Sequence, residues 1–243
     1  MNTKIDINYK WDTEYNDFIN YLFSIRDIKY KNFQGNLGID KETIIGIKIP
    51  ILKDIAKKIA KKEYKSFIKN NKHKYFEEIL IHGLIIGYLK DYTEAIHMLN
   101  DYLPYISNWA LCDSTCANFK LIKNNLDKTY PLILSYLYDE NPWVRRVGIV
   151  LLLNFYVNDE YIDNIIIEFS KIKLDDYYVK MALAWLIQVC YIKYPIKTID
   201  FLRFNKIDNW THNKAIQKIR ESLKVTPKEK EKLNYLKRGI NNE

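Results

Sequence analysis

Apolar residues recur along the chain at helical spacing in stretches of about four turns, separated by short polar breaks. The clearest landmarks in this pattern are five aromatic residues at a nearly constant interval. Tyr75, Trp109, Trp143, Tyr177 and Trp210 are separated by 34, 34, 34 and 33 residues. The pattern predicts a helical structural unit that repeats along the chain.

A helix-capping residue stands just before four of these five aromatic residues. The four caps, in chain order, are Asn108, Asn141, Asp176 and Asn209, and Pro142 follows the second of them. Asn and Asp side chains accept hydrogen bonds from the unpaired amides of a first helical turn, and Pro suits the first helical position because it has no N–H to satisfy. We therefore expect each of these aromatic residues to open a helix.

A second, usually shorter helix follows each of these helices after a polar break, as in Asp127 to Tyr138 and Asp159 to Lys171. Two helices per unit at this period are typical of an α-solenoid, in which each pair buries its apolar stripe by stacking on its neighbours. From Asp12 onward we expect an all-α chain of about twelve helices in roughly six HEAT-like pairs, with a concave face. The residues from Thr226 to Glu229 predict a capping box at the start of the last helix.

No linker divides the chain, so we expect a single domain over residues 1–243. Only 7 glycines and 6 prolines occur in 243 residues, too few turn-formers for a sandwich or barrel of many short strands. The one irregular stretch that we expect runs from Lys29 to Gly46 and contains three glycines. Gly83 and Gly87 are interpreted as positions where two helices pack closely.

The charge of the chain adds a functional prediction to the helical fold, namely that the protein binds a polyanion. The chain carries 38 Lys and Arg against 30 Asp and Glu, a net charge of +8. The excess is concentrated toward the two ends: nine lysines oppose two acids between Ile51 and Tyr75, and nine basic residues oppose three acids between Lys214 and Arg238. Either cluster alone is also compatible with an ordinary solvated face, but the pair favours nucleic acid as the partner.

Three scattered cysteines give no disulfide framework, which suggests a reducing compartment. The N-terminal residues lack an apolar signal region, and no apolar run approaches the roughly 18 residues that span a bilayer. We expect a soluble cytoplasmic protein that does not associate with membranes. The four histidines are not at metal-ligand spacing, and Cys112 with Cys116 lacks further ligands, so we expect no metal and interpret these cysteines as small apolar residues.

The segment from Asn108 to Asn118 contains the first candidate for chemistry. Trp109 and Asp113 are four residues apart, so they share a helix face, and Asp113 lies little more than one turn from the positive helix N-terminus. The repeat supplies an internal control, because the equivalent positions in the next two units are Val147 and Met181. A carboxylate therefore stands where the repeat otherwise has apolar residues. The alternative is that Asp113 is a surface cap or an ion-pair partner.

Two further segments depart from an ordinary repeat. Arg145 and Arg146 lie one turn into a helix with a wholly apolar continuation, so at least one guanidinium must face an edge of the core or a groove. Such a side chain can bind a phosphate or carboxylate, or cover apolar surface with its stem. The segment from Tyr178 to Trp185 is filled with small apolar residues and Lys180, and the spacing alone favours a core position for Trp185.

Together these segments resemble the DNA alkylation repair family of AlkD-like HEAT-repeat DNA glycosylases, and the resemblance covers nearly the whole chain. The segments that carry it, in family order, are Gly46 to Lys53, Asn108-Trp109-x3-Asp113, Trp143-x-Arg145-Arg146, Tyr178-x-Lys180-x3-Ala184-Trp185 and Asn213 to Lys218. Gly148, where relatives of this kind are expected to have alanine, is a small departure.

The resemblance implies a monofunctional glycosylase that excises positively charged N-alkylated purines, such as 3-methyladenine and 7-methylguanine, from duplex DNA held in the concave groove. It implies that Asp113 is the catalytic carboxylate, that Trp109 and Trp185 are aromatic walls beside the lesion, and that the protein needs no cofactor and acts as a monomer. The phosphate-holding residues that it implies are Arg146, Arg145, Lys180, Lys53, Lys214 and Lys218, and which of the two arginines takes the functional place stays open.

Two alternatives remain. A non-catalytic solenoid could bind DNA structures or a protein partner, since a fold alone never fixes a function. A bifunctional lyase would need a nucleophilic amine in the groove, and the many lysines leave that alternative open. Asp113 separates the first alternative from the enzyme, because a scaffold has no need of an ionised carboxylate beside an indole.

Overall fold

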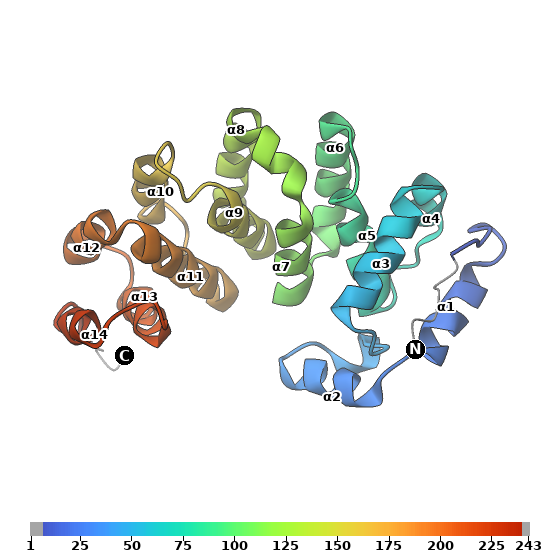
Figure 1. Ribbon diagram of the computed structural model, residues 1–243, viewed down its shortest axis with the longest axis horizontal. Coiled ribbons are helices and arrows are strands. Elements are labelled where there is room, and N and C mark those ends of the chain that lie inside the picture. Colours follow the sequence, from blue (N-terminus) through green and yellow to red (C-terminus); the bar gives the residue numbers. More distant parts are fainter. Residues whose placement is uncertain (1–6, 240–243) are drawn as a thin grey trace. The chain divides into compact units, whose positions relative to one another are not determined.

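The computed structural model describes residues 7–239, and within this range the chain is helical and contains no β-strand (Figure 1). The chain forms two compact units, residues 1–121 and residues 122–243. The prediction of an all-α fold with helices packed in adjacent pairs, as in an α-solenoid, is confirmed. The single-domain expectation stays a prediction, and the two units are described in turn.

The first unit contains seven α-helices and two 3₁₀ turns within its described residues. They are α1 (Tyr15–Ser24), α2 (Ile28–Asn36), η1 (Lys41–Thr43), α3 (Ile49–Ala60), α4 (Tyr64–Asn70), α5 (Phe76–Ile86), α6 (Tyr92–Tyr102), η2 (Leu103–Tyr105) and α7 (Trp109–Asn118). Helices α3, α5 and α7 pack one beside the next, while α4 lies against α3 and α6 against α5. Helix α5 is buried nearly all round because it lies between two neighbours.

The second unit repeats this arrangement with longer inner helices. After the turn η3 (Lys120–Asn124), it contains α8 (Leu126–Leu137), α9 (Pro142–Phe155), α10 (Ile162–Phe169), α11 (Tyr177–Lys193), α12 (Pro195–Phe204), α13 (Asn209–Glu221) and α14 (Pro227–Asn234). Helices α9, α11 and α13 pack side by side, and α8, α12 and α14 each pack against one of them. The apolar stripe of each inner helix is thus covered by its neighbours in the stack.

Three of the four predicted helix caps are confirmed, and so is the predicted capping box. Asn108 accepts hydrogen bonds from two amides of α7, Asn141 accepts one from α9 and Asp176 accepts two from α11. The capping box of Thr226 and Glu229 opens α14 as expected. The expected cap of α13 was wrong by one residue, because Asp208 rather than Asn209 accepts from the backbone amide of Thr211.

The expectation that Lys29 to Gly46 is irregular was wrong for its first part, where α2 forms. The carboxylate of Asp27 caps this helix by accepting from the amide of Tyr30 at 3.0 Å. The glycines misled the prediction because Gly35 lies inside the last turn of α2, and only Gly38 and Gly46 adopt positive φ, at 88° and 112°. Capping thus outweighed the weak helix propensity of this segment.

A buried carboxylate fixes the loop that leads from α2 into α3. Glu77 on α5 accepts hydrogen bonds from the amides of Ile45, Gly46 and Ile47 at 2.9, 2.7 and 3.0 Å. Burial raises the pKa of Glu77, and the three amides act in the opposite direction. The start of α3, with Lys53 in its first turns, is therefore held against α5 by one side chain.

Close packing between α5 and α7 explains the two glycines of α5, as the sequence predicted. A Cβ atom at Gly83 would lie 2.1 Å from Oγ1 of Thr115, and one at Gly87 would lie 2.4 Å from the backbone oxygen of Asn118. Cys112 and Cys116, on the same helix α7, are buried, as expected for small apolar residues. None of the helices formed by residues 7–239 is long and apolar enough to cross a membrane.

Candidate functional site

The N-terminal turn of α7 presents Trp109 and Asp113 on one face of the helix. Both side chains are partly exposed, whereas Ala110, Leu111 and Cys112 between them are buried in the stack. Helical spacing places residues four apart above one another, so the carboxylate lies one turn beyond the indole. This face of α7 is therefore not buried in the stack, and it carries a carboxylate near the positive end of the helix.

The indole of Trp109 is oriented by a contact from outside its own helix. Its Nε1–H donates to the carbonyl oxygen of Leu37, in the loop after α2, at 3.2 Å. Asn108 caps the same helix end by accepting from the amides of Ala110 and Leu111, both at 3.1 Å. The position of Trp109 thus depends on both its own cap and a loop far away in the sequence.

The repeat comparison shows that the face of α7 is unusual. Val147, which occupies the position of Asp113 in α9, has 0% exposure and belongs to the core. Met181, at the same position in α11, is partly exposed but apolar. The repeat therefore does not require a polar group here, and the carboxylate of Asp113 is a departure specific to α7.

The paired arginines of α9 have different surroundings. Arg145 is 1% exposed, and its guanidinium donates to the carbonyl oxygens of Asp139 and Glu140 at 2.7 and 3.0 Å and forms an ion pair with Asp175. Arg146 is 5% exposed and donates to the carbonyl oxygen of Tyr178 at 2.6 Å. Arg145 ties the α8–α9 turn to the start of α11, a structural task that sequence reasoning did not assign to it.

Basic side chains gather on α9 and α13 of the second unit, and we call Arg146, Lys214 and Lys218 the basic cluster. Partial burial lowers the pKa of Lys218, and the nearby positive charges of Lys214 and Arg146 lower it further, while Glu221 opposes them. Lys218 therefore lies close enough to Lys214 and to Arg146 to be repelled by both charges. Such an arrangement is typical of a surface that binds a polyanion.

The remaining predicted residues fall in one unit or the other. Lys53 is partly exposed on α3 in the first unit. Lys180 on α11 lies 3.4 Å from the carboxylate of Asp208, which caps α13, so this lysine is held at the start of α13. Trp185, further along α11, is partly exposed between buried Ala184 and Leu186, although its spacing had favoured the core. Trp109 and Asp113 lie in the first unit, and the basic cluster and Trp185 in the second.

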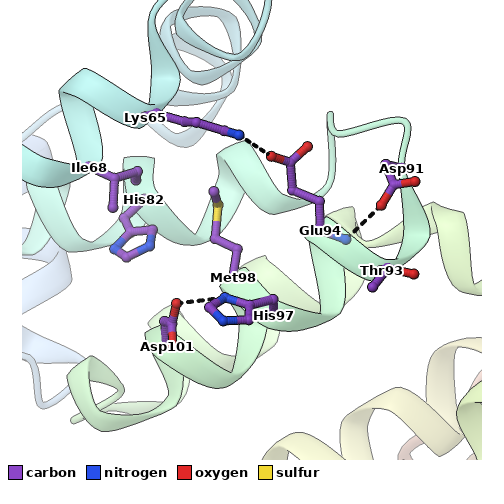
Figure 2. Close-up of a pocket in the computed structure, with 9 residues that line it drawn as sticks. All are labelled: Lys65, Ile68, His82, Asp91, Thr93, Glu94, His97, Met98 and Asp101. Atoms are coloured by element: carbon purple, nitrogen blue, oxygen red, sulfur yellow. Dashed lines mark hydrogen bonds and ion pairs between the residues drawn. The ribbon is translucent and has the colours of Figure 1, made fainter.

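In contrast to the basic cluster, a cavity of the first unit has three acidic side chains on its walls. It has a volume of about 500 Å³ and is lined from α4, α5 and α6 by Lys65, His82, Asp91, Glu94, His97 and Asp101 among others (Figure 2). Lys65 pairs with Glu94 at 2.8 Å, and His97 with Asp101 at 2.9 Å. Three carboxylates on its walls make it a poor place for a phosphate, so the cavity is no candidate for binding nucleic acid.

A buried histidine pair lies next to this cavity. His82 is 2% exposed, and its Nδ1 lies 3.0 Å from Nε2 of His73, which has a positive φ of 50°. Burial lowers the pKa of His82 to about 3, and the charge of His73 acts in the same direction. Among the described residues none hydrogen-bonds to Nε2 of His82. Burial lowers the pKa of His73 as well, so both rings favour the neutral form.

The model of a family described as DNA alkylation repair enzyme matches residues 21–219. The matched range includes α7 with Trp109 and Asp113, both arginines of α9, Trp185 and the two lysines of α13. The chain matches none of the curated proteins with which it was compared.

Proposed function

This chain belongs to the DNA alkylation repair enzyme family, and we propose that it is a monofunctional DNA glycosylase. Its substrates are positively charged N-alkylated purines in duplex DNA, such as 3-methyladenine and 7-methylguanine. It hydrolyses their N-glycosidic bond and acts as a monomer. The observation that carries this proposal is the partly exposed carboxylate of Asp113, one turn from Trp109 at a repeat position that is apolar in α9 and α11.

The chemistry of such substrates needs few protein groups. An N-alkylated purine is already a cationic leaving group, so its departure requires no general acid, in contrast to ordinary glycoside hydrolysis with its two carboxylates. The deoxyribose acquires positive charge as the bond breaks. An ionised Asp113 near C1′ stabilises that charge more strongly in the transition state than in the substrate, and it orients the attacking water.

The aromatic and basic residues take supporting roles in this proposal. The faces of Trp109 and Trp185 attract the cationic lesion and the developing positive charge of the sugar through cation–π contact. The basic cluster, Lys53 and Lys180 hold phosphates without reading the base sequence. Arg146 is assigned to a phosphate because its charge acts on Lys218 in the basic cluster, whereas Arg145 links the α8–α9 turn to the start of α11.

The test is release of free bases from methylated duplex DNA, measured by chromatography. We expect release by the wild type and a loss of about 10²–10³-fold in rate for Asp113→Asn, the size observed when one group that stabilises transition-state charge is removed. Asp17→Asn, at an exposed carboxylate in the first turn of α1, is the matched control and should retain full activity.

The rival proposals predict different results. A non-catalytic solenoid would bind the duplex but release no base with either protein. A lyase would cleave the strand after base removal and could be trapped on the DNA by borohydride, because its amine forms a Schiff base with the sugar. Release without trapping supports the monofunctional enzyme.

A further inference from the structure

A second concave site lies at the C-terminal end of the second unit. Its cavity has a volume of about 580 Å³, within the range of small-molecule sites. It is formed by the first turns of α13 and by residues 237 and 238 after α14. The residues that matter here are Trp210, Asn213, Lys214, Gln217, Lys237 and Arg238.

The walls of this cavity combine a partly exposed aromatic ring with positive charge. The indole of Trp210 is 40% exposed, and the ammonium group of Lys214 lies 5.5 Å from its centroid. Lys237 and Arg238 add two further cations, and none of the described residues that line the cavity is acidic. A planar group bound to the indole would therefore lie beside cations that suit an anion.

Hydrogen bonds between side chain and backbone hold this wall in place. The side chain of Asn213 accepts from the amide of Arg238 at 3.0 Å and donates to its carbonyl oxygen at 2.9 Å. The guanidinium of Arg238 donates to the carbonyl oxygen of Ile207 at 2.8 Å and to Asn205. Arg238 is thus engaged inside the unit, and Lys214 donates to Oε1 of Gln217 on the same cavity wall at 2.8 Å. The ammonium groups of Lys214 and Lys237 are the cations of this wall that a ligand would meet.

Trp210 also ends a continuous series of aromatic rings, which we call the aromatic row. The row runs across the starts of α9, α11 and α13. The ring centroids are 5.0 Å apart for Trp143 and Tyr178, 5.2 Å for Tyr178 and Tyr177, and 5.6 Å for Tyr177 and Trp210. Tyr177 is 57% exposed. Exposed aromatic rings in series next to basic residues are typical of surfaces on which unpaired bases stack.

We infer that this cavity binds an unpaired nucleotide, with the base on the indole of Trp210 and the phosphate on Lys214 and Lys237. The aromatic row gives adjacent unpaired bases a place to stack. The inference rests on the proposed function for the source of the nucleotide, which is a single-stranded segment of DNA next to the bound duplex. A free mononucleotide has the same chemistry and is the other source that the experiment must distinguish.

The experiment compares a labelled blunt duplex with the same duplex that carries a short single-stranded overhang, by fluorescence anisotropy at fixed salt with the full-length protein. We expect the wild type to bind the overhang duplex roughly tenfold more tightly, since stacking of one base contributes about that factor. Trp210→Leu should remove this preference, Trp210→Phe should keep part of it, and Lys214→Gln should reduce it. Phe204→Ala, at an aromatic residue with 80% exposure that does not line the cavity, is the matched control and should keep all of it.

Competition experiments identify the source. Deoxyadenosine monophosphate that displaces the overhang as well as a single-stranded oligonucleotide does would support the cavity and assign it to free nucleotides. A polyglutamate peptide that competes equally well would show that only charge is recognised and would overturn the inference. An equal affinity of the wild type for both duplexes, or a preference that survives in Trp210→Leu, would also overturn it.

The outcome is separable from the proposed function. Base release without any preference for the overhang would reject this inference and leave the glycosylase intact. A preference for the overhang without base release would support the cavity and reject the enzyme.

Discussion

Helices α7 and α13 both carry a tryptophan in the first turn and differ in the charge that follows. In α7, Trp109 is followed four residues later by Asp113, and in α13, Trp210 is followed four residues later by Lys214. The same helical geometry thus offers an indole beside a carboxylate in one unit and an indole beside an ammonium group in the other. The first pair suits a developing cation, and the second suits a phosphate with its base.

Helices α9 and α11, which lie between them in the sequence, show which residue type packing favours at this repeat position. The equivalent residue is buried Val147 in α9 and apolar Met181 in α11. Packing therefore asks for an apolar residue at this position, and each of the two exceptions requires a different explanation. The comparison teaches that a repeat protein can be searched for sites by looking for charge at a position that packing leaves apolar.

Reversing the charges of Asp113 and Lys214 is the strongest test of the different roles of these two residues. Asp113→Lys should abolish base release, a loss of at least about 10³-fold, because a cation near the sugar raises the barrier where the carboxylate lowered it. The matched reversal Lys214→Asp should retain base release at low salt. It should also flatten the salt dependence of duplex binding by about two phosphate equivalents. Chromatography of released bases and anisotropy across a salt series measure these effects, and equal activities for the two variants would contradict the comparison.

A second comparison concerns the glycines that let helices pack. A Cβ at Gly87 would lie 2.4 Å from a backbone oxygen of α7, whereas a Cβ at Gly148 would lie 2.9 Å from the Cδ2 of Leu137, the end of a flexible side chain. Gly87→Ala should therefore lower the free energy of unfolding by about 2–3 kcal/mol, as overpacking does. Gly148→Ala should change it by less than about 1 kcal/mol, because the helix propensity of alanine offsets the movement of Leu137. Urea unfolding of both variants checks this order, and equal losses would contradict it.

Acid should weaken the first unit through its buried histidine. His82 has a pKa of about 3 in the folded chain, against an ordinary 6.5 when unfolded. Its contribution to stability is therefore complete above pH 6.5 and is lost as the pH falls from there toward 3, because only the unfolded state takes up the proton. The expected loss is about 2 kcal/mol between pH 7 and pH 5.

Urea unfolding at the two pH values measures this loss, with two variants as references. His82→Asn should remove most of the pH dependence, while His97→Asn, at an exposed histidine paired with Asp101, should leave it nearly unchanged. A wild type whose stability does not change between pH 7 and pH 5 would show that His82 is not shielded as the structure describes.

Local signals in the sequence predicted the helix starts well, because a cap acts within its own turn. Asn108, Asn141 and Asp176 cap their helices as expected. Helix α2 was missed because three glycines outweighed the cap of Asp27 in the prediction. Tertiary contacts account for the other differences. The burial of Arg145 depends on Asp175 thirty residues away, and the task of Glu77 depends on a loop that precedes it by a similar distance.

The residues of the candidate site can likewise be separated into those that local signals predicted and those that depend on tertiary contacts. The shared face of Trp109 and Asp113 follows from helical spacing, so the sequence alone predicted it. The cavity beside Trp210 forms because residues 237 and 238 lie against α13. No local sequence pattern predicts this tertiary contact. The regular interval of Trp143, Tyr177 and Trp210, together with Tyr178 next to Tyr177, was the sequence signal for the aromatic row.

The contact between Trp109 and Leu37 has a consequence for how this protein can change over evolutionary time. The carbonyl oxygen that orients the indole lies 72 residues earlier in the chain, in a surface loop that tolerates insertion and deletion more readily than a helix does. Lengthening or shortening that loop would turn the indole without altering α7. If the proposed glycosylase is correct, selection for bulkier or smaller adducts therefore has a route that leaves Asp113 and its helix untouched.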